Sequence, residues 1–450
     1  MNPRIFGTDG VRGRSNQGFL TPGHLVQLAQ SIGMEFVSGH HRHLVVIGKD
    51  TRLSGYMLEP ALTAGFISIG FDVILVGPMP TPAIAMLVQS LRADLGIMIS
   101  ASHNPSDDNG IKIFGPDGYK LPDALERAIE KRFYNFSETL LPPAHKLGHA
   151  KRLDDALGRY IEYVKTSFEK GVRLDGLKIV IDCAHGATYK IAPTILWELG
   201  AEVIPIGVKP DGTNINQDCG ATKTERMCQA VVDHGAHVGI SLDGDGDRVI
   251  FADEKGHRID GDHILAMIAT LWKQQGRLKH QTIVATVMSN MGLENYLKTQ
   301  GIALQRTDVG DRYVIEAMKL GGFNVGGEQS GHIILRDYST TGDGLVALLQ
   351  VLRLLVQSQK PASEVFHLFT PMPQILKNYR FKNKELLQHS TVKSKIASVY
   401  TILERADGRL LIRVSGTEPL IRIMAENANC DLMEKCVNDL LETLEDIDSQ

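Results

Sequence analysis

The sequence predicts an α/β protein in which three similar mixed α/β modules are followed by a smaller α+β C-terminal domain. Three observations support this fold class: the length, an internal repeat and a change of pattern near residue 372. A chain of 450 residues is longer than one hydrophobic core usually organises, and its length suggests roughly three or four domains. A content of 43% hydrophobic and 22% charged residues is typical of globular proteins.

The internal repeat is visible when residues 45–78, 179–208 and 283–311 are aligned. Each segment starts with a β-branched run, passes through a polar loop and a helix-periodic stretch to a glycine, and ends in a second apolar run and a closing glycine. Such a strand–helix–strand unit requires parallel pairing and a right-handed crossover. We expect each unit to continue through a helix to a third strand and a loop rich in functional groups. These loops are residues 100–105, 243–248 and 327–332.

The C-terminal part has a different pattern. A Lys-rich segment begins near Met372, and Asp407-Gly408 between two apolar runs predicts a β-hairpin. We therefore expect an antiparallel sheet, closed by a helix that starts at Asp431. The predicted domains are 1–150 with the serine loop, 151–255 with the aspartate loop, 256–370 with the glutamate loop, and 371–450.

Composition and charge exclude several classes of protein. A formal net charge of -4 without a long basic run argues against nucleic acid as a partner. The start of the chain has no apolar signal segment, and no later apolar run has the length of a membrane span. The five cysteines form no CxxC pair, which fits reduced thiols. We expect a cytoplasmic protein with a small-molecule ligand.

The aspartate loop is the most specific signal. Asp243, Asp245 and Asp247 alternate with glycines between two apolar runs, and three such carboxylates can fold onto one hard cation. An EF-hand is the rival interpretation, with Glu254 at its twelfth position, but Arg248 occupies the position that needs glycine, and the flanks are not helical. Mg²⁺ takes few carboxylates and completes its octahedron with phosphate or water. The loop predicts a magnesium site, with a solvated acidic turn as the alternative.

The serine loop follows the apolar run 95–99, which predicts a buried strand. The carboxyl end of such a strand is where α/β proteins handle ligands. A phosphate on Ser102 would carry a charge of about -1.5 to -2 and could share a metal with the aspartates. Lys112, on the next predicted strand, is a candidate acid/base or charge stabiliser. His103 is expected to serve the turn, since neighbouring side chains commonly diverge. The alternative is a polar turn that merely ends the strand.

Two further loops suit a sugar phosphate. Glu328 and Ser330, between glycines, suit sugar hydroxyls or an amino group, although a plain polar turn explains them equally well. Near the start of the chain, Arg12 follows a glycine-rich stretch that either places its guanidinium by a phosphate or makes a tight turn.

The last loop carries a hydroxyl-rich segment after an apolar strand. Arg413, Ser415, Gly416 and Thr417 offer forked donors and a backbone nest that suit a phosphate dianion. An ordinary strand-to-helix turn capped by Thr417 is the alternative. Arg422 brackets the same loop, which favours phosphate binding.

The five stretches FGTDGVRG, SASHNP, DGDGDR, GEQSGH and RVSGTEP, in this order, closely resemble the motifs of the α-D-phosphohexomutase superfamily. The resemblance covers essentially the whole chain. The forms FGTDGVRG and GEQSGH favour the member that acts on glucosamine phosphate over the phosphomannomutase/phosphoglucomutase branch. The resemblance implies interconversion of glucosamine 6-phosphate and glucosamine 1-phosphate, on the route to UDP-N-acetylglucosamine and peptidoglycan. Glucose and mannose phosphates are the competing substrates.

The resemblance also implies a site in one central cleft shared by all four domains, with the last domain moving. It implies one Mg²⁺ per chain, a phosphoserine, and a hexosamine or glucose 1,6-bisphosphate as activator or intermediate. A homodimer, an activating kinase and autophosphorylation are left open. The implied metal ligands are Ser102, Asp243, Asp245 and Asp247. The implied catalytic residues are Ser102, Arg12, Lys112, Arg248 and, with less support, His332. The implied substrate-binding residues are Glu328, Ser330, Arg413, Ser415, Gly416 and Thr417.

Two other classes of function remain as rivals. A metal-dependent hydrolase would use Ser102 or an aspartate, but the chain contains neither a GxSxG elbow nor a GxxxxGK[ST] loop. A sugar-phosphate binding protein regulated by phosphorylation of Ser102 would bind its ligand without turning it over.

Overall fold

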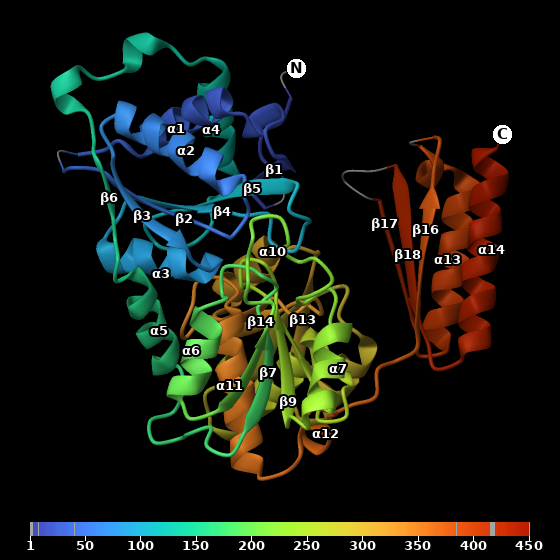
Figure 1. Ribbon diagram of the computed structural model, residues 1–450. Coiled ribbons are helices and arrows are strands. Elements are labelled where there is room, and N and C mark those ends of the chain that lie inside the picture. The colour runs from blue at the N-terminus through green and yellow to red at the C-terminus, as the bar shows by residue number, and fades with distance from the viewer. Residues whose placement is uncertain (1–2, 8, 40, 384, 415–418, 450) are drawn as a thin grey trace. The chain divides into compact units, whose positions relative to one another are not determined.

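The computed structural model of the chain describes residues 3–7, 9–39, 41–383, 385–414 and 419–449 (Figure 1). The chain divides into two compact units. Unit 1 comprises Met1–Met288 and Gln300–Leu368, and unit 2 comprises Ser289–Thr299 and Phe369–Gln450. Among the described residues, no helix has both the length and the apolar character needed to cross a membrane.

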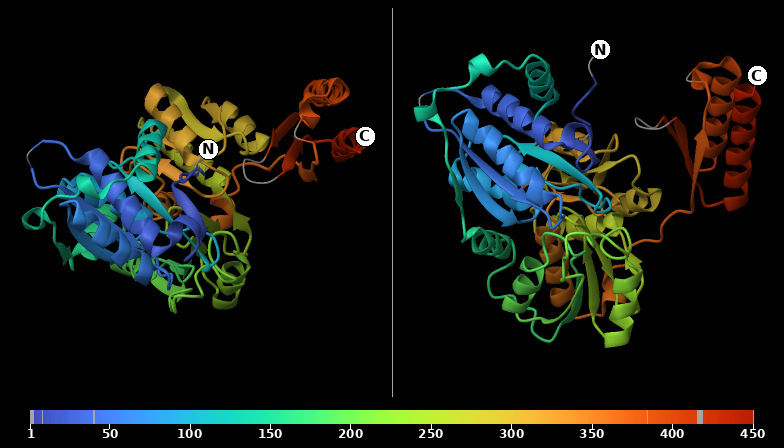
Figure 2. Two further views of the ribbon diagram at one scale, coloured as in Figure 1. Left: turned by 90° about the horizontal axis from the view of Figure 1, so that it is seen from above. Right: turned by 45° about the horizontal axis from the view of Figure 1, so that its top comes forward.

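Unit 1 begins with a six-stranded sheet in the order β1-β5-β4-β2-β3-β6. The helices α1, α2 and α4 cover one face of this sheet, and α3 lies on the other (Figures 1 and 2). Apolar residues of these three helices pack with residues of β2, β3 and β4 in one core. The strands are β1 (Val11–Arg14), β2 (Leu44–Lys49), β3 (Asp72–Pro78), β4 (Leu95–Ile99), β5 (Asp108–Phe114) and β6 (Ala150–Arg152). The helices are α1 (Pro22–Phe36), α2 (Gly55–Ser68), α3 (Thr81–Leu91) and α4 (Asp123–Tyr134).

Two smaller sheets follow, one in the order β11-β10-β9-β7-β8 and one in the order β13-β12-β14-β15. The first of these has β7 (Lys178–Asp182), β8 (Glu202–Ile206), β9 (Val238–Leu242), β10 (Val249–Ala252) and β11 (Arg258–Ile259), with α5 (Ala156–Thr166), α6 (Ile191–Glu198) and α7 (Glu225–His234) in the same part of the chain. The second has β12 (Thr282–Thr286), β13 (Ala303–Thr307), β14 (Val325–Gly327) and β15 (Ile333–Leu335), and its part of the chain carries α8 (Gly261–Gln274), α10 (Asp311–Gly321), α11 (Gly344–Ser358) and α12 (Ala362–Val365).

The three sheets share one pairing pattern, which confirms the predicted repeat. In each sheet the first strand of the repeat pairs in parallel with the second and the third, as β2 does with β3 and β4. The third strand then turns into an antiparallel fourth, so that β4 pairs with β5, β9 with β10 and β14 with β15. Strands such as β4 are buried along their whole length, because helices cover both faces, and they therefore read as continuous apolar runs.

Unit 2 holds an antiparallel sheet in the order β16-β18-β17. Its strands are β16 (Gln374–Arg380), β17 (Arg409–Val414) and β18 (Leu420–Glu426), and its helices are α9 (Met291–Thr299), α13 (Ser390–Arg405) and α14 (Cys430–Asp448). The antiparallel sheet and the closing helix are as predicted, and the predicted fold class is confirmed. The four domain ranges of the sequence analysis stay a prediction.

The hairpin predicted at Asp407-Gly408 is wrong. These residues join the end of α13 to β17, and Asp407 adopts a left-handed φ of 55° there. The apolar residues before them, Val399 and Leu403, are four positions apart and buried in the core of unit 2, so they form the inner face of a helix. A turn-forming pair after an apolar run does not distinguish a helix end from a hairpin.

Candidate active site

The connection between β9 and β10 carries the three predicted metal ligands. Asp243, Asp245 and Asp247 are all buried, and one oxygen of each lies within 4.8 Å of an oxygen of the others. Gly246 has a φ of +70°, and its N–H donates to the carbonyl of Asp243 at 3.1 Å, which closes the turn. The alternation of aspartate and glycine therefore lets the chain bend tightly enough to point three carboxylates at one place.

Two carboxylate oxygens of this loop have no hydrogen-bond donor among the residues that the structure describes. The ammonium of Lys112 donates to Asp245 Oδ2 at 2.7 Å and to Asp247 Oδ2 at 2.9 Å. Asp245 Oδ1 and Asp247 Oδ1 are buried and accept no hydrogen bond from the described residues. Buried polar atoms are normally satisfied, and hard oxygen ligands are those that Mg²⁺ prefers. The residues present therefore fit a divalent cation such as Mg²⁺.

Ser102 lies against this loop. Its hydroxyl donates to Asp243 Oδ2 at 2.6 Å, although 141 residues separate the two in the chain. Ser102 adopts a left-handed φ of 51°, a conformation that costs energy for a residue other than glycine and that needs support from its surroundings. Part of the support comes from Ser100, whose Oγ accepts from the Ser102 N–H at 2.9 Å and donates to Asp50 at 2.6 Å.

Arg52, which was not predicted from the sequence as a site residue, supplies further support. Its side chain is completely buried, and its guanidinium pairs with Asp50 Oδ2 at 2.8 Å. The remaining donors reach three backbone carbonyls of the serine loop and one at the start of β5. These carbonyls belong to Ser102 (3.1 Å), Asn104 (2.8 Å), Asp108 (3.0 Å) and Pro105. Arg52 follows β2, the strand next to β4 in the sheet, and its position at a strand end is the signal that could have identified it.

The serine and aspartate loops approach each other at Gly244. A Cβ on Gly244 would lie 2.6 Å from the carbonyl oxygen of Ser102, so any side chain there would push the loops apart. Asn216 bridges the same junction, because its amide donates to the carbonyls of Ser102 at 2.9 Å and of Asn104 at 3.0 Å. The contact between the two loops thus depends on a glycine and an asparagine as well as on the Ser102–Asp243 bond.

His103 lies closer to Ser102 than expected. Its Nδ1 is 3.4 Å from Ser102 Oγ, so the expectation that the two side chains diverge is wrong. Burial, together with the positive charges of Arg248 and Arg12, lowers the pKa of His103 to about 4. The imidazole beside the serine is therefore neutral at pH 7.

Lys112, which is buried, and Arg12, which is partly exposed, belong to one cluster of charges around Asp9. Burial alone would lower the pKa of Lys112, but the carboxylates of Asp245, Asp247 and Asp9 outweigh it and raise this pKa well above its usual value. Arg12 Nη2 donates to Asp9 Oδ2 at 2.7 Å. Burial would raise the pKa of Asp9, but the ammonium of Lys112 and its other cationic neighbours lower it. Asp9, which the sequence analysis did not single out, therefore stays ionised and holds two of the predicted catalytic cations.

Arg248 and His332 pair through an isolated β-bridge. His332 Nδ1 lies 3.7 Å from Asp247 Oδ1, and its Nε2 lies 3.7 Å from Asp311 Oδ2. Burial would lower the pKa of His332, but Asp247 and Asp311 outweigh it and raise the pKa. Burial would likewise lower the pKa of Arg248, but the carboxylates of the aspartate loop and of Glu328 outweigh it and raise this pKa.

The glutamate loop, residues 327–332, lies beside the aspartate loop. Glu328 Oε1 accepts from the N–H of Gly310 at 3.1 Å, and Ser330 Oγ lies 3.3 Å from Glu328 Oε2. The N–H of Val249 donates to the carbonyl of Gly331 at 3.0 Å, which joins this loop to the start of β10. The structure thus brings together the serine, aspartate and glutamate loops, all within unit 1.

The predicted C-terminal phosphate loop lies in unit 2. Arg413 is at the end of β17, opposite Arg422 in the register of β17 and β18. Ser415, Gly416 and Thr417 lie outside the described residues, so their part in substrate binding stays a prediction.

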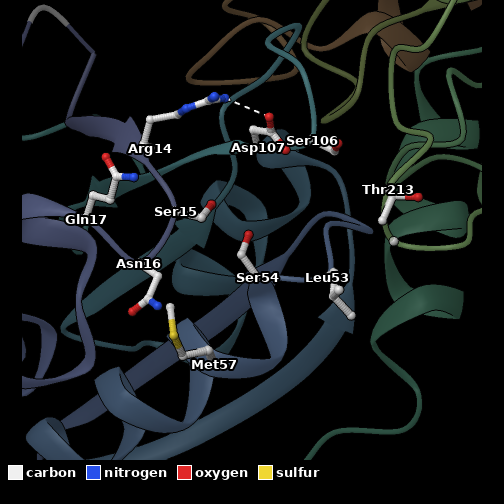
Figure 3. Close-up of a pocket in the computed structure, with 11 residues that line it drawn as sticks. Arg14, Ser15, Asn16, Gln17, Leu53, Ser54, Met57, Ser106, Asp107 and Thr213 are labelled. Carbon is white, nitrogen blue, oxygen red and sulfur yellow. Dashed lines mark hydrogen bonds and ion pairs between the residues drawn. The ribbon is translucent and has the colours of Figure 1, made fainter.

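A cavity of about 510 Å³ lies elsewhere in unit 1 (Figure 3). Its lining includes Leu53, Met57 and the ion pair between Arg14 and Asp107, whose atoms are 2.8 Å apart. Among the described residues, none of the site residues predicted from the sequence lines this cavity. Leu53 directly follows Arg52 in the chain and Ser106 directly follows the serine loop, so the cavity borders the segments that hold Ser102.

Four family models match the chain in succession: phosphoglucomutase/phosphomannomutase α/β/α domain I at residues 3–139, domain II at 158–256, domain III at 260–372 and the C-terminal domain at 376–443. The chain belongs to the phosphoglucomutase/phosphomannomutase family, and the resemblance noted from its motifs is confirmed.

The chain is also similar to individual proteins of this family. The chain is 60% identical over 447 residues to a protein named phosphoglucosamine mutase from Paramagnetospirillum magneticum, and the match covers 99% of both chains. Among solved structures, a phosphoglucomutase/phosphomannomutase family protein from Burkholderia thailandensis aligns with a TM-score of 0.83 at 22% identity, over 99% of this chain and 97% of that one. An N-acetylphosphoglucosamine mutase from Aspergillus fumigatus, in complex with GlcNAc-6P and magnesium, aligns with a TM-score of 0.68 at 17% identity, over 99% of this chain and 96% of that one. These two structures share the fold.

Proposed function

We propose that this protein is a mutase that interconverts glucosamine 6-phosphate and glucosamine 1-phosphate, in the supply of UDP-N-acetylglucosamine for peptidoglycan. The observation that carries the proposal is the 2.6 Å contact between Ser102 Oγ and Asp243. Asp243 belongs to a buried triad of aspartates, two oxygens of which accept no hydrogen bond from the described part of the chain. A hydroxyl in that position can carry a phosphoryl group next to a divalent ion. The 60% identity to a phosphoglucosamine mutase supports glucosamine phosphate as the substrate.

Ser102, Asp243, Asp245 and Asp247 would hold one Mg²⁺. The ion, when bound, supplies positive charge that offsets the negative charge of a transferring phosphoryl group. Lys112 adds a second positive charge, because its raised pKa keeps it protonated at neutral pH. We assign Lys112, Arg12 and Arg248 to the stabilisation of the reacting phosphate.

In the proposed reaction, Ser102 carries the phosphoryl group at the start of each cycle. The bond from Ser102 Oγ to phosphorus breaks as a bond forms from a sugar hydroxyl oxygen to the same phosphorus, and the hydroxyl proton ends on Ser102 Oγ. His332 is the proposed proton carrier. The product is a sugar bisphosphate, which reorients, so that its other phosphoryl group returns to Ser102 by the reverse exchange. Glu328 and Ser330 would hold the sugar hydroxyls in both orientations.

The magnitude of the task favours a preorganised site. Cleavage of phosphate monoesters is among the slowest uncatalysed reactions, and enzymes accelerate it by up to ~10²¹. One exposed ion pair contributes about 0.2–1 kcal/mol, which is far too little. Alignment of the reactants supplies about 7–11 kcal/mol, and fixed charges in a buried site supply more. The buried Lys112 and the constrained Ser102 are features that such a site requires.

Replacing Ser102 by alanine tests the proposal. We expect S102A to lose turnover of glucosamine 6-phosphate, while S106A, which removes a neighbouring serine hydroxyl, keeps it. Peptide mapping should find a phosphate on Ser102 in active protein. Full activity of S102A would overturn the proposal. Release of inorganic phosphate would instead indicate a hydrolase, and tight binding without turnover would indicate a regulated binding protein.

Assays with glucose and mannose phosphates determine the substrate preference, which we expect to favour glucosamine phosphate. Incubation of dephosphorylated protein with glucose 1,6-bisphosphate, followed by intact mass measurement, separates activation by a bisphosphate from activation by a kinase. We also propose a cytoplasmic location, where the five free cysteines would stay reduced.

A further inference from the structure

A second cluster of metal-ligating side chains lies at the turn between β10 and β11. Asp253 directly follows β10, and His257 directly precedes β11. His367, which lies 110 residues further along the chain, follows α12 and reaches the same carboxylate. One potential ligand atom of each of the three residues lies within 4.8 Å of those of the others.

The carboxylate of Asp253 is held in one orientation. It is completely buried, and its Oδ1 accepts backbone hydrogen bonds from the N–H groups of Lys255 at 2.9 Å and His257 at 2.8 Å. These two bonds leave Oδ2 to the imidazoles. His257 Nδ1 lies 3.1 Å from Oδ2, and His367 Nε2 lies 2.9 Å from it. Backbone groups thus orient the carboxylate in the way that outer partners usually orient metal ligands.

We propose that Asp253, His257 and His367 bind a divalent ion that accepts imidazole and carboxylate ligands, with Zn²⁺ as the representative. A tetrahedral Zn²⁺ with ligands at about 2.0–2.1 Å separates neighbouring ligand atoms by about 3.3–3.4 Å. The separations of 3.1 Å and 2.9 Å between Asp253 Oδ2 and the two imidazole nitrogens need to open by only a few tenths of an ångström to reach that value. Two imidazoles select an ion of this class over Mg²⁺, which prefers oxygen ligands.

The surroundings leave room for the ion. The side chain of His257 is 64% exposed and that of His367 is 41% exposed, so water can complete the coordination from the open side. The site lies outside the residues that we assign to catalysis, and it does not depend on the proposed function. His367 precedes Leu368, the last residue of unit 1, so a bound ion would tie the point where the chain leaves this unit to the β10–β11 turn.

Protection of histidines from diethyl pyrocarbonate tests the proposal on the unaltered protein. Mg²⁺ is kept saturating to occupy the aspartate triad, Zn²⁺ is added, and modified histidines are mapped by mass spectrometry. At free Zn²⁺ about tenfold above the dissociation constant the site is about nine-tenths occupied, so modification of His257 and His367 should be about tenfold slower. The exposed His145 is the internal reference and should react at the same rate with and without Zn²⁺.

Calorimetric titration gives the second measurement. The variant H257Q/H367Q should bind one Zn²⁺ fewer than the unaltered protein, with unchanged mutase activity and circular dichroism. The matched control is H41Q, which removes another imidazole that lies 2.7 Å from a carboxylate, that of Asp94. H41Q should keep the protection of His257 and His367. Equal modification rates at these two histidines with and without Zn²⁺ would overturn the proposal, as would an unchanged stoichiometry in H257Q/H367Q.

Discussion

Asp343 should make the stability of unit 1 depend on pH in a direction unusual for a carboxylate. It is the N-cap residue of α11, and it accepts hydrogen bonds from the N–H groups of Leu345 and Val346, both at 3.0 Å, and from the hydroxyl of Tyr160 at 2.9 Å. Complete burial outweighs these bonds and raises its pKa from 3.8 to about 6. The folded state therefore binds a proton that the unfolded state has already lost.

The sign and the size follow from linkage. Between the two pKa values the folded state holds more protons than the unfolded state, so the free energy of unfolding decreases as pH rises. With pKa values of 3.8 and about 6, ionisation of Asp343 costs about 1.6 kcal/mol at pH 5 and about 3 kcal/mol at pH 7.5. The variant D343N retains an N-cap side chain but cannot ionise. The free energy of unfolding of D343N, relative to that of the unaltered protein, should therefore be about 1.4 kcal/mol higher at pH 7.5 than at pH 5.

Urea unfolding followed by tryptophan fluorescence measures this difference. Both tryptophans of the chain, Trp197 and Trp272, lie in unit 1, so their signal reports on that unit. Any constant effect of losing the Tyr160 bond cancels when the two pH values are compared. The control is D155N, at the exposed N-cap of α5, where a hydrogen bond from Arg159 lowers the pKa and ionisation is complete throughout this range. The reasoning would be refuted if the difference in free energy of unfolding between D343N and the unaltered protein did not change with pH. It would also be refuted if D343N became relatively more stable as the pH falls.

Three further predictions concern the active site. R52M should lower the free energy of unfolding by about 3–5 kcal/mol, because Asp50 would stay buried without its charged partner, and kcat should fall more than KM changes. Urea unfolding and steady-state kinetics measure the two effects, and R52K should show smaller ones. A wild-type kcat in R52M would contradict the positioning role of Arg52. The kcat of G244A should be about 10²-fold lower, since the added Cβ would displace Ser102 from Asp243. In the control G158A, whose added Cβ would contact nothing on the face of α5, kcat should be unchanged. Chelation of divalent ions should abolish turnover and Mg²⁺ should restore it, and activity that persists in excess chelator would remove the metal from the mechanism.

The fold class and most of the candidate site residues could be predicted because both depend on patterns within short stretches of the sequence. Parallel strands covered by helices read as apolar runs, and the loops at their carboxyl ends concentrate polar residues. The DGDGDR stretch needs no distant partner to be recognised as a bend of carboxylates. The sequence also predicted that a phosphate on Ser102 and the three aspartates share one metal ion, because a phosphate and carboxylates are both ligands of Mg²⁺.

The positioning residues could not be predicted in this way. Arg52 acts on backbone carbonyls about 50 residues away, and Asn216 on carbonyls more than 110 residues away. Asp9 gains its role only because Arg12 and Lys112 converge on it in the folded chain. Charge pairs of this kind leave no periodicity in the sequence, and a lysine on a strand looks like any exposed lysine until its partners are known.

The repeat explains why the three loops meet. In each module the functional loop is the connection from the third strand to the antiparallel fourth: β4 to β5, β9 to β10, and β14 to β15. The loops of the first and second modules touch through Ser102 and Asp243, and the third joins the second through the backbone of Gly331 and Val249. In the proposed function, equivalent positions of three similar modules would therefore supply a phosphate carrier, a metal site and a sugar site. The modules need the same strands to bring the loops together, whereas each loop needs its own side chains, so the framework can repeat while the chemistry differs.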